Sequence, residues 1–251
     1  MSNLSGKFVW FEHVSNDIGQ ARRFYEPLFG WHTEAMPMGD AEPYPMILNA
    51  GVPIGGYTLA PQGAPTGWLS YLSVANVDVA YRRALDAGAT SLMAPMDYGT
   101  AGRAATLADP TGAVFAIWKG SQGDPADVPS SPIGSFICNE LTTQDEQAAL
   151  AFYEKAFGFA HDAKPMAQGT YYVLKQGDAM RGGLCKAMHL STPAMWAQYV
   201  KVDDCDATAA KAHALGAQSL VPPMDITGIG RFSMFSDPQG AVIAVMKPAP
   251  M

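Results

Sequence analysis

Two glutamates, Glu12 and Glu140, are the side chains in this sequence best suited to proton transfer. Each lies in a short apolar segment (residues 7–14 and 136–141), which is typical of a strand. A carboxylate enclosed by apolar side chains has a raised pKa, and it can then serve as a general base with a tyrosine as its proton-transfer partner. Both glutamates are therefore candidate catalytic residues or ligand anchors.

A structural role for the same glutamates is the alternative, and the sequence favours it. One arginine, Arg103 or Arg231, accompanies each glutamate at the corresponding place in the two halves of the chain. A buried carboxylate needs a partner, and an ion pair with that arginine would supply one. A pair that recurs in two halves which otherwise differ is more typical of architecture than of catalysis.

The three cysteines, Cys138, Cys185 and Cys205, form no metal-binding or disulfide pattern. Their number is odd and their spacing differs from that of zinc sites. His13 and His189 likewise have no partners at ligand spacing. A reactive thiol at Cys138 is one interpretation, but an inert buried cysteine is the preferred one.

The sequence repeats itself after about 128 residues, and this is its strongest signal. The repeat pairs Glu12 with Glu140, Phe24-Tyr25 with Phe152-Tyr153, Tyr71 with Tyr199, Arg103 with Arg231, and the Asp-Pro-x-Gly segments 109–112 and 237–240. A stretch rich in Gly, Pro and Ser separates the copies. We therefore expect two homologous domains, residues 6–119 and 134–247, joined by a linker over residues 120–133.

Each half is predicted to contain two copies of a strand, a helix and three further strands. The first copy has a strand at 7–14, a helix at 18–29 with apolar residues at helical spacing, and strands at 31–35, 45–49 and 54–59. The second has a strand at 68–74, a helix at 77–87 and strands at 91–94, 103–108 and 113–119. Helices at 145–157 and 204–215 repeat the order. The expected fold class is α+β, built from four βαβββ modules.

Composition restricts the partners. The 251 residues carry a net charge of −7 with no basic stripe, so nucleic acid and anionic membranes are poor partners. No segment has the length and apolarity of a membrane span or a signal peptide. We expect a cytoplasmic protein, a monomer or homodimer, that takes a small-molecule ligand.

The repeated module, which ends in an Asp-Pro-x-Gly hairpin, resembles that of the vicinal oxygen chelate superfamily, which includes glyoxalase I, bleomycin resistance proteins and extradiol dioxygenases. The resemblance rests on Asp17, Phe24-Tyr25, Phe29-Gly30 and the turn at 109–112, each repeated in the second half, and it covers nearly the whole chain. The two-domain glyoxalase-like subgroup is the closer match. In that family two modules form one cup-shaped sheet, so the resemblance implies two tandem cups.

The family's metal site does not map onto suitable residues. Catalytic members hold a divalent ion with a His or Gln from the first strand and a Glu from the last strand of each module. The corresponding positions carry aromatic, aliphatic and thiol side chains: Trp10, Leu69, Ala116, Cys138, Ala197 and Ala244. Residues 46–60, where the remaining ligand of the first cup belongs, contain no Asp, Glu, His or Cys. We therefore expect no metal and no cofactor, which disfavours the ion-dependent mechanisms of the family.

Side-chain alternation along the strands indicates which residues face the cups. The expected ligand-binding residues are Trp10, Tyr71, Arg103 and Trp118 in the first cup, and Cys138, Tyr199, Arg231 and Met246 in the second. Glu12 is expected to be satisfied by Arg103 or Tyr71, and Glu140 by Arg231 or Tyr199. Such an aromatic, mostly apolar pocket with one carboxylate suits a small organic molecule, for example an aromatic or carbonyl compound.

Two classes of function stay open. The first is a glyoxalase/bleomycin resistance-like protein that binds a small organic molecule in cups lacking the family's metal ligands. The second is a metal-free enzyme, a lyase, isomerase or hydroxylase-like protein, that uses Glu12 or Glu140 as acid or base. A metal-dependent glyoxalase or dioxygenase ranks last, and the sequence leaves open whether the chain is an enzyme at all.

Overall fold

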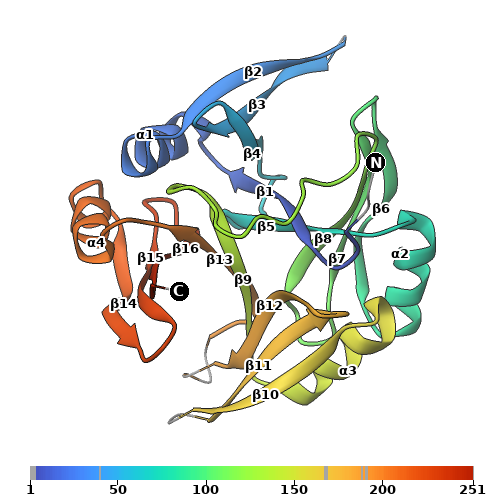
Figure 1. Cartoon of the computed structure of the whole chain (residues 1–251). Helices are drawn as coiled ribbons and strands as arrows, with labels where there is room; N and C mark the ends of the chain where they lie inside the picture. Colours follow the sequence, from blue (N-terminus) through green and yellow to red (C-terminus); the bar gives the residue numbers. More distant parts are fainter. Residues whose placement is uncertain (1–3, 40, 167–168, 188, 190–191, 251) are drawn as a thin grey trace. The chain divides into compact units, whose positions relative to one another are not determined.

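The four predicted modules are present in the predicted order in the computed structural model, which describes residues 4–39, 41–166, 169–187, 189 and 192–250 (Figure 1). Module 1 consists of β1 (Phe8–Ser15), α1 (Ile18–Phe29), β2 (His32–Met38), β3 (Ala41–Asn49) and β4 (Val52–Leu59). Module 2 consists of β5 (Gly67–Ser73), α2 (Val77–Asp86), β6 (Thr90–Tyr98), β7 (Gly102–Ala108) and β8 (Val114–Gly120). Module 3 consists of β9 (Phe136–Thr143), α3 (Glu146–Phe157), β10 (Ala160–Met166), β11 (Gly169–Gln176) and β12 (Ala179–Lys186). Module 4 consists of β13 (Met195–Lys201), α4 (Cys205–Ala214), β14 (Gln218–Ile226), β15 (Gly230–Ser236) and β16 (Val242–Pro248).

The strands form two eight-stranded sheets, one from each half of the chain. Their orders are β2-β3-β4-β1-β5-β8-β7-β6 and β10-β11-β12-β9-β13-β16-β15-β14. In each module the first strand runs parallel to the last, whereas the remaining neighbours pair as antiparallel hairpins. The predicted α+β fold class is confirmed. Within the described residues no strand of one half enters the sheet of the other, as predicted.

Packing divides the chain differently from the sequence halves. Unit 1 comprises Met1–Trp10, Leu69–Asp127 and Cys138–Trp196, and unit 2 comprises Phe11–Trp68, Val128–Ile137 and Ala197–Met251. In unit 1, α2 packs against α3 and Lys155 Nζ donates a hydrogen bond to the carbonyl of Asp86. In unit 2, α1 packs against α4 and Lys211 Nζ donates to the carbonyl of Pro27. Each unit thus combines modules from both halves, and the domain boundaries 6–119 and 134–247 stay a prediction.

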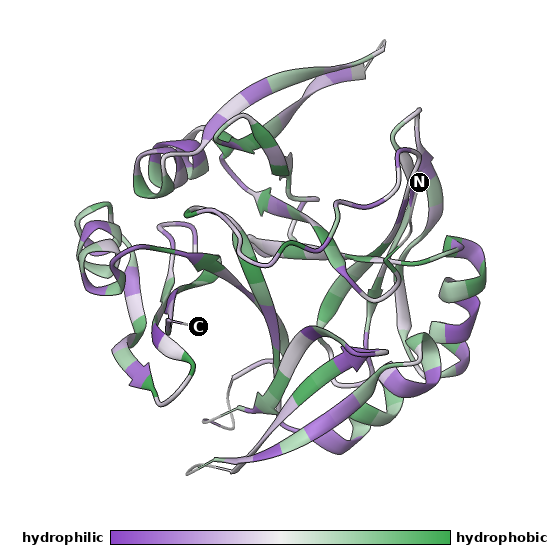
Figure 2. Cartoon of the chain, viewed as in Figure 1, coloured by the Kyte–Doolittle hydropathy of each residue, from purple (hydrophilic) through white to green (hydrophobic). Residues whose placement is uncertain are grey.

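The helices begin and end at residues that cap them. Asp17 Oδ1 accepts a hydrogen bond from the backbone N–H of Gln20 at 2.9 Å, and Asp145 does the same for Ala148. Gly30 follows α1 with φ of 71°, a left-handed conformation that glycine adopts without strain. Figure 2 shows that α2 and α3 carry both hydrophilic and hydrophobic positions, as expected of helices that bury one face. In the described part of the chain, no helix has the length and apolarity needed to cross a membrane.

In unit 1 the Asp-Pro-x-Gly turn is part of a buried hydrogen-bond network. Asp109 is 3% exposed, and its Oδ1 accepts the backbone N–H groups of Thr111 and Ala113. Its Oδ2 accepts a hydrogen bond from Tyr153 Oη of α3 at 3.1 Å. Tyr153 Oη in turn accepts a hydrogen bond from Trp196 Nε1 at 2.7 Å. These contacts give Asp109 a structural role, because they connect the turn to a helix and a strand.

Unit 2 repeats the network with one addition. Asp237 accepts from Tyr25 Oη at 3.0 Å, and Tyr25 accepts from Trp68 Nε1. The addition is His13, which is fully buried and donates from Nε2 to Asp237 Oδ2 at 2.9 Å. The equivalent residue in the other half is Leu141. In the described part of the structure His13 Nδ1 has no hydrogen-bond partner, so the histidine adds a buried polar atom that is left unsatisfied.

Candidate functional site

In unit 1, Glu140 of β9 is held by a tyrosine that neither the repeat nor strand alternation identified. Glu140 lies opposite Gly183 of β12 in the parallel pair β9–β12, and Tyr171 lies on β11, one strand further out. The Tyr171 side chain hydrogen-bonds Glu140, and its pKa is raised first by burial and then by the charge of Glu140. The phenol therefore stays protonated and acts as the donor.

Gly183 makes this contact across a strand possible. A Cβ atom built on Gly183 would collide with the hydroxyl of Tyr171, so only glycine lets the ring pass over β12 to reach β9. A side chain at position 183 and the hydroxyl of Tyr171 therefore cannot occupy the same space, so the residue types at the two positions depend on each other.

Replacing Gly183 with alanine is expected to displace the Tyr171 hydroxyl from Glu140. The overlap should lower the free energy of unfolding by about 1–3 kcal/mol, as other overpacked sites do. The atoms that clash with this Cβ are the phenol oxygen and then Cζ of Tyr171, so removing the oxygen in a Tyr171→Phe background should reduce the cost in part. A double-mutant cycle by urea unfolding measures this coupling. If Gly183→Ala lowers the free energy of unfolding equally in the parent and in Tyr171→Phe, the Tyr171 hydroxyl does not lie over Gly183.

Two thiols complete what we call the carboxylate cluster, which comprises Cys138, Glu140, Tyr171 and Cys185. Cys138 lies two residues before Glu140 and shares its face of the sheet, and Cys185 hydrogen-bonds Glu140. Burial, followed by the charge of Glu140, raises the pKa of both thiols to about 12. Neutral groups that are weak acids therefore surround the carboxylate.

The same arrangement occurs in unit 2. Tyr44 Oη of β3 donates to Glu12 Oε1 at 3.0 Å, Glu12 pairs with Gly56 of β4, and a Cβ on Gly56 would collide with the Tyr44 hydroxyl. Sequence reasoning missed Tyr44 and Tyr171. A signal was available in the Gly-Gly pairs 55–56 and 182–183, which repeat together with the tyrosines. Glu–Tyr–Gly is therefore a repeated structural motif of this chain.

The prediction that Arg103 or Arg231 neutralises the glutamates is wrong. Arg103 donates to Asp78 of α2 at 3.0 and 2.8 Å, and to Asp97 of β6 at 3.0 Å. Ala104, the next residue, packs with Tyr71, so alternation along β7 directs Arg103 to the opposite face of the strand.

Arg231 is held in the corresponding way. It pairs with Asp206 of α4 and Asp225 of β14, while Phe232, the next residue, contacts Tyr199. Aspartates thus hold both arginines, and the prediction that these arginines bind the ligand stays a prediction. The alternative partners, Tyr71 for Glu12 and Tyr199 for Glu140, stay predictions.

Arg103→Ala is therefore expected to leave stability nearly unchanged. The arginine and its two aspartates form a surface ion-pair network, and solvent and salt screen such pairs. Thermal melts at low and high salt should show a small loss that disappears as salt is added. A large, salt-independent loss would indicate a buried partner for Arg103.

The first sheet also carries a group of aromatic residues, which we call the aromatic cluster, in unit 1. Tyr71, Ala104 and Ala116 form its buried centre, and Trp10, Leu69, Tyr98 and Trp118 pack against them. Trp118 lies edge-on to both Tyr71 and Tyr98, with ring centroids 6.2 Å apart in both pairs. Three of the predicted ligand-binding residues, Trp10, Tyr71 and Trp118, thus come together.

The corresponding positions in unit 2 form a smaller group. The Tyr199 and Phe232 rings lie 6.3 Å apart, and half-buried Met246, at the position of Trp118, pairs with Phe232 across β15 and β16. The two sheets therefore differ in the aromatic side chains they carry at these positions.

Strand register shows which residues lie opposite one another at the last-strand positions, Ala116 and Ala244, that the resemblance assigns to metal ligands. Glu12 pairs with Gly56 just as Tyr71 pairs with Ala116, and Glu140 pairs with Gly183 just as Tyr199 pairs with Ala244. The last-strand positions therefore carry glycine or alanine in all four modules. Within the described ranges, no group of three or more His, Cys, Asp or Glu side chains could hold a metal ion. The side chains at these positions do not fit the family's divalent ion.

Comparisons with known proteins agree with the two-sheet architecture. Residues 10–118 match the model of the Glyoxalase-like domain, and residues 135–245 match that of the Glyoxalase/Bleomycin resistance protein/Dioxygenase superfamily. The chain is 39% identical over 247 residues to "Putative glyoxylase CFP32" of Mycobacterium tuberculosis (strain CDC 1551 / Oshkosh), covering 96% of this chain and 94% of that protein.

A second relative and a solved structure extend the comparison. The chain is 30% identical over 258 residues to "Anthracycline biosynthesis protein DnrV" of Streptomyces peucetius, covering 96% of this chain and 93% of that protein. The Mn(II)-bound glyoxalase from Novosphingobium aromaticivorans superposes with a TM-score of 0.64 at 15% identity, over 96% of this chain and 81% of that one. The structural likeness is one of fold.

Proposed function

Because this chain belongs to the glyoxalase/bleomycin resistance protein/dioxygenase superfamily, we propose that it binds a small hydroxylated aromatic molecule, with its inner glutamates in place of the family's metal ion. The observation that carries the proposal is the Glu–Tyr–Gly motif. Each glutamate lies on the strand that begins its module, two residues after Trp10 or Cys138, the first-strand metal-ligand position.

The motif suits a polar anchor in an otherwise apolar site. Tyr171 and Cys185 both hydrogen-bond Glu140 and fix its orientation, and an ionised carboxylate can accept about four hydrogen bonds on its two oxygens. A ligand hydroxyl that donates to this carboxylate would form a charge-assisted hydrogen bond, the strong kind in a dry site. Such a contact needs no metal ion.

The ligand class follows from the aromatic cluster of unit 1 and from one relative. Trp10, Tyr71, Tyr98 and Trp118 offer flat apolar surfaces that stack well on an aromatic ring. The relative from Streptomyces peucetius is named for anthracycline biosynthesis, and anthracyclines are hydroxylated polycyclic aromatic compounds. A hydroxyanthraquinone is therefore a suitable probe.

Titration of dihydroxyanthraquinone, followed by quenching of tryptophan fluorescence, tests the proposal. Glu140→Gln and Glu12→Gln remove the charge but keep the shape, and at least one of them should weaken binding about 10–100-fold, the effect of losing a hydrogen bond to a charged group. Glu154→Gln, at an exposed position on α3, is the matched control and should bind like the parent. Unchanged binding in both inner variants would refute the glutamates as anchors.

Metal-independent acid–base catalysis is the second candidate, and the hydrogen bond between Tyr171 and Glu140 favours it. A carboxylate with an attached phenol can accept a proton from a ligand hydroxyl or from a carbon next to a carbonyl. Product analysis after incubation with the probe separates the two functions. Turnover that is lost in Glu140→Gln while binding persists supports an enzyme, and an unchanged probe supports a binding protein.

A further inference from the structure

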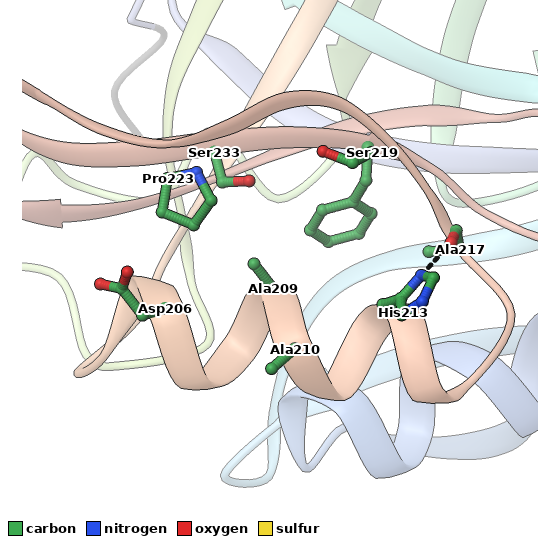
Figure 3. A pocket seen from close by; sticks show the side chains of 9 residues that line it. Asp206, Ala209, Ala210, His213, Ala217, Ser219, Pro223 and Ser233 are labelled. Atoms are coloured by element: carbon green, nitrogen blue, oxygen red, sulfur yellow. Dashed lines mark hydrogen bonds between the residues drawn. The ribbon is translucent and has the colours of Figure 1, made fainter.

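A pocket of about 280 Å³ lies in unit 2, between α4 and the hairpin of β14 and β15. Figure 3 shows Ala209 of α4 pointing toward Pro223, Ser219 and Ser233 of the two strands, with Asp206 and His213 at the two ends, and Ala210 beside it also lines the pocket. Phe235, which is 3% exposed, also lines it. Ser233 and Phe235 alternate along β15 with Phe232, which contacts Tyr199, so the pocket lies on the opposite face of that strand.

The pocket is present because the repeat lacks one ring there. Module 2 matches module 4 residue for residue in this region, with α2, β6 and β7 in the same register as α4, β14 and β15. In module 2 the position of Ala209 is occupied by Tyr81, which is half-buried and donates from Oη to Ser91 Oγ at 2.6 Å. Ser91 has its counterpart in Ser219, and Arg82 is replaced by Ala210. Module 4 therefore has the serine that accepts the hydrogen bond but has alanine where module 2 has the tyrosine.

The polar groups around the pocket are already engaged, with one exception. Asp206 is bound by Arg231, His213 Nδ1 lies 3.3 Å from the carbonyl of Ala217, and Ser233 Oγ donates to the carbonyl of Val221. In the described part of the chain, Ser219 Oγ makes no side-chain hydrogen bond. The walls are apolar, and the carboxylate of Asp206 at one end disfavours an anion.

We propose that this pocket binds the neutral ring of a small phenol, in the place that Tyr81 occupies in the other half. The ring would lie between Ala209 and Phe235, and its hydroxyl would donate to Ser219 Oγ. An apolar cavity of about 150 Å³ is enough to hold benzene, so the volume suffices. A ligand of this size would bind with a dissociation constant on the order of 1 mM.

Methyl NMR of the full chain labelled at alanine provides a local test, using phenol as the probe. The Ala210 and Ala217 methyl signals should shift saturably with phenol in the parent and stay unmoved in Ala209→Tyr, whose own ring fills the pocket. Fluorobenzene, which lacks the hydroxyl, should bind about fivefold more weakly than phenol. Ser219→Ala should abolish that preference.

The repeat supplies a reciprocal control. Tyr81→Ala should open the matching pocket in module 2, so that the Ala89 methyl signal begins to respond to phenol. Methyl signals of Ala210 and Ala217 that ignore phenol in the parent, or that shift equally in Ala209→Tyr, would overturn the proposal. Both results are independent of ligand binding by Glu12 or Glu140, since the readout comes from methyl groups at this pocket and at its counterpart in module 2.

Discussion

Asp237→Ala is expected to lower the free energy of unfolding by about 3–5 kcal/mol, the cost typical of breaking a buried charged network from one side. Asp237 is 3% exposed and accepts hydrogen bonds from His13, Tyr25 and the backbone N–H groups of Gln239 and Ala241. Alanine would leave all of these donors buried without an acceptor. Urea unfolding, followed by fluorescence, measures the loss.

His13→Leu is the matched control, because the other half of the chain has Leu141 at the same place. Asp109 shows that the network holds with tyrosine and backbone donors alone. Leucine would also remove the unsatisfied Nδ1 atom. We expect stability within about 1 kcal/mol of the parent. A loss as large as that of Asp237→Ala would show that the hydrogen bond from His13, and not the tyrosine and backbone donors, stabilises the turn.

Acid should reduce the effect of Asp237→Ala. Burial raises the pKa of Asp237, but hydrogen bonds from His13 and the N–H groups of Ala241 and Gln239 outweigh it, so the pKa lies below its usual value. A carboxyl group with a lowered pKa stabilises the fold above its unfolded pKa of about 4, and this contribution is lost as pH falls through the folded value. The difference between parent and variant should therefore be largest near neutral pH and shrink in acid.

Cys138 and Cys185 are expected to react with iodoacetamide at pH 8 on the order of 10³-fold more slowly than a free thiol. With a pKa of about 12, only about one thiol in 10⁴ is ionised at that pH, against roughly a quarter for a pKa of 8.5. Mass spectrometry of the alkylated peptides under native conditions gives both rates.

Glu140→Gln should accelerate the reaction of Cys185, because removing the neighbouring charge lowers the pKa of the thiol. Glu154→Gln on α3 should leave the rate unchanged. Native thiols that react as fast as free ones, with no response to Glu140→Gln, would contradict the enclosed carboxylate cluster.

The fold could be predicted from the sequence because its determinants are local and occur four times. Helical spacing in α1, the caps Asp17 and Gly30, and the Asp-Pro-x-Gly turns each specify an element without reference to distant residues. The apolar segments 7–14 and 136–141 also placed Glu12 and Glu140 on strands, β1 and β9. The repeat then established the module order.

The partners of the glutamates could not be predicted in the same way. Tyr44 reaches Glu12 across an intervening strand, over Gly56, and such a contact depends on the order of three strands. Arg103 was assigned to the cup because it recurs in each half, but recurrence does not indicate a face. Ala104, its neighbour, shows that alternation along β7 directs Arg103 to Asp78 of α2 instead.

Binding by the metal-stripped protein tests the central claim most directly. Protein dialysed against a chelator, and checked for metal content, is titrated with dihydroxyanthraquinone before and after addition of Mn(II). The inner glutamates, held by Tyr44 and Tyr171, should bind the probe with the same dissociation constant in both samples, and Glu12→Gln and Glu140→Gln should weaken it in both. Binding that appears only when Mn(II) is added would contradict the account.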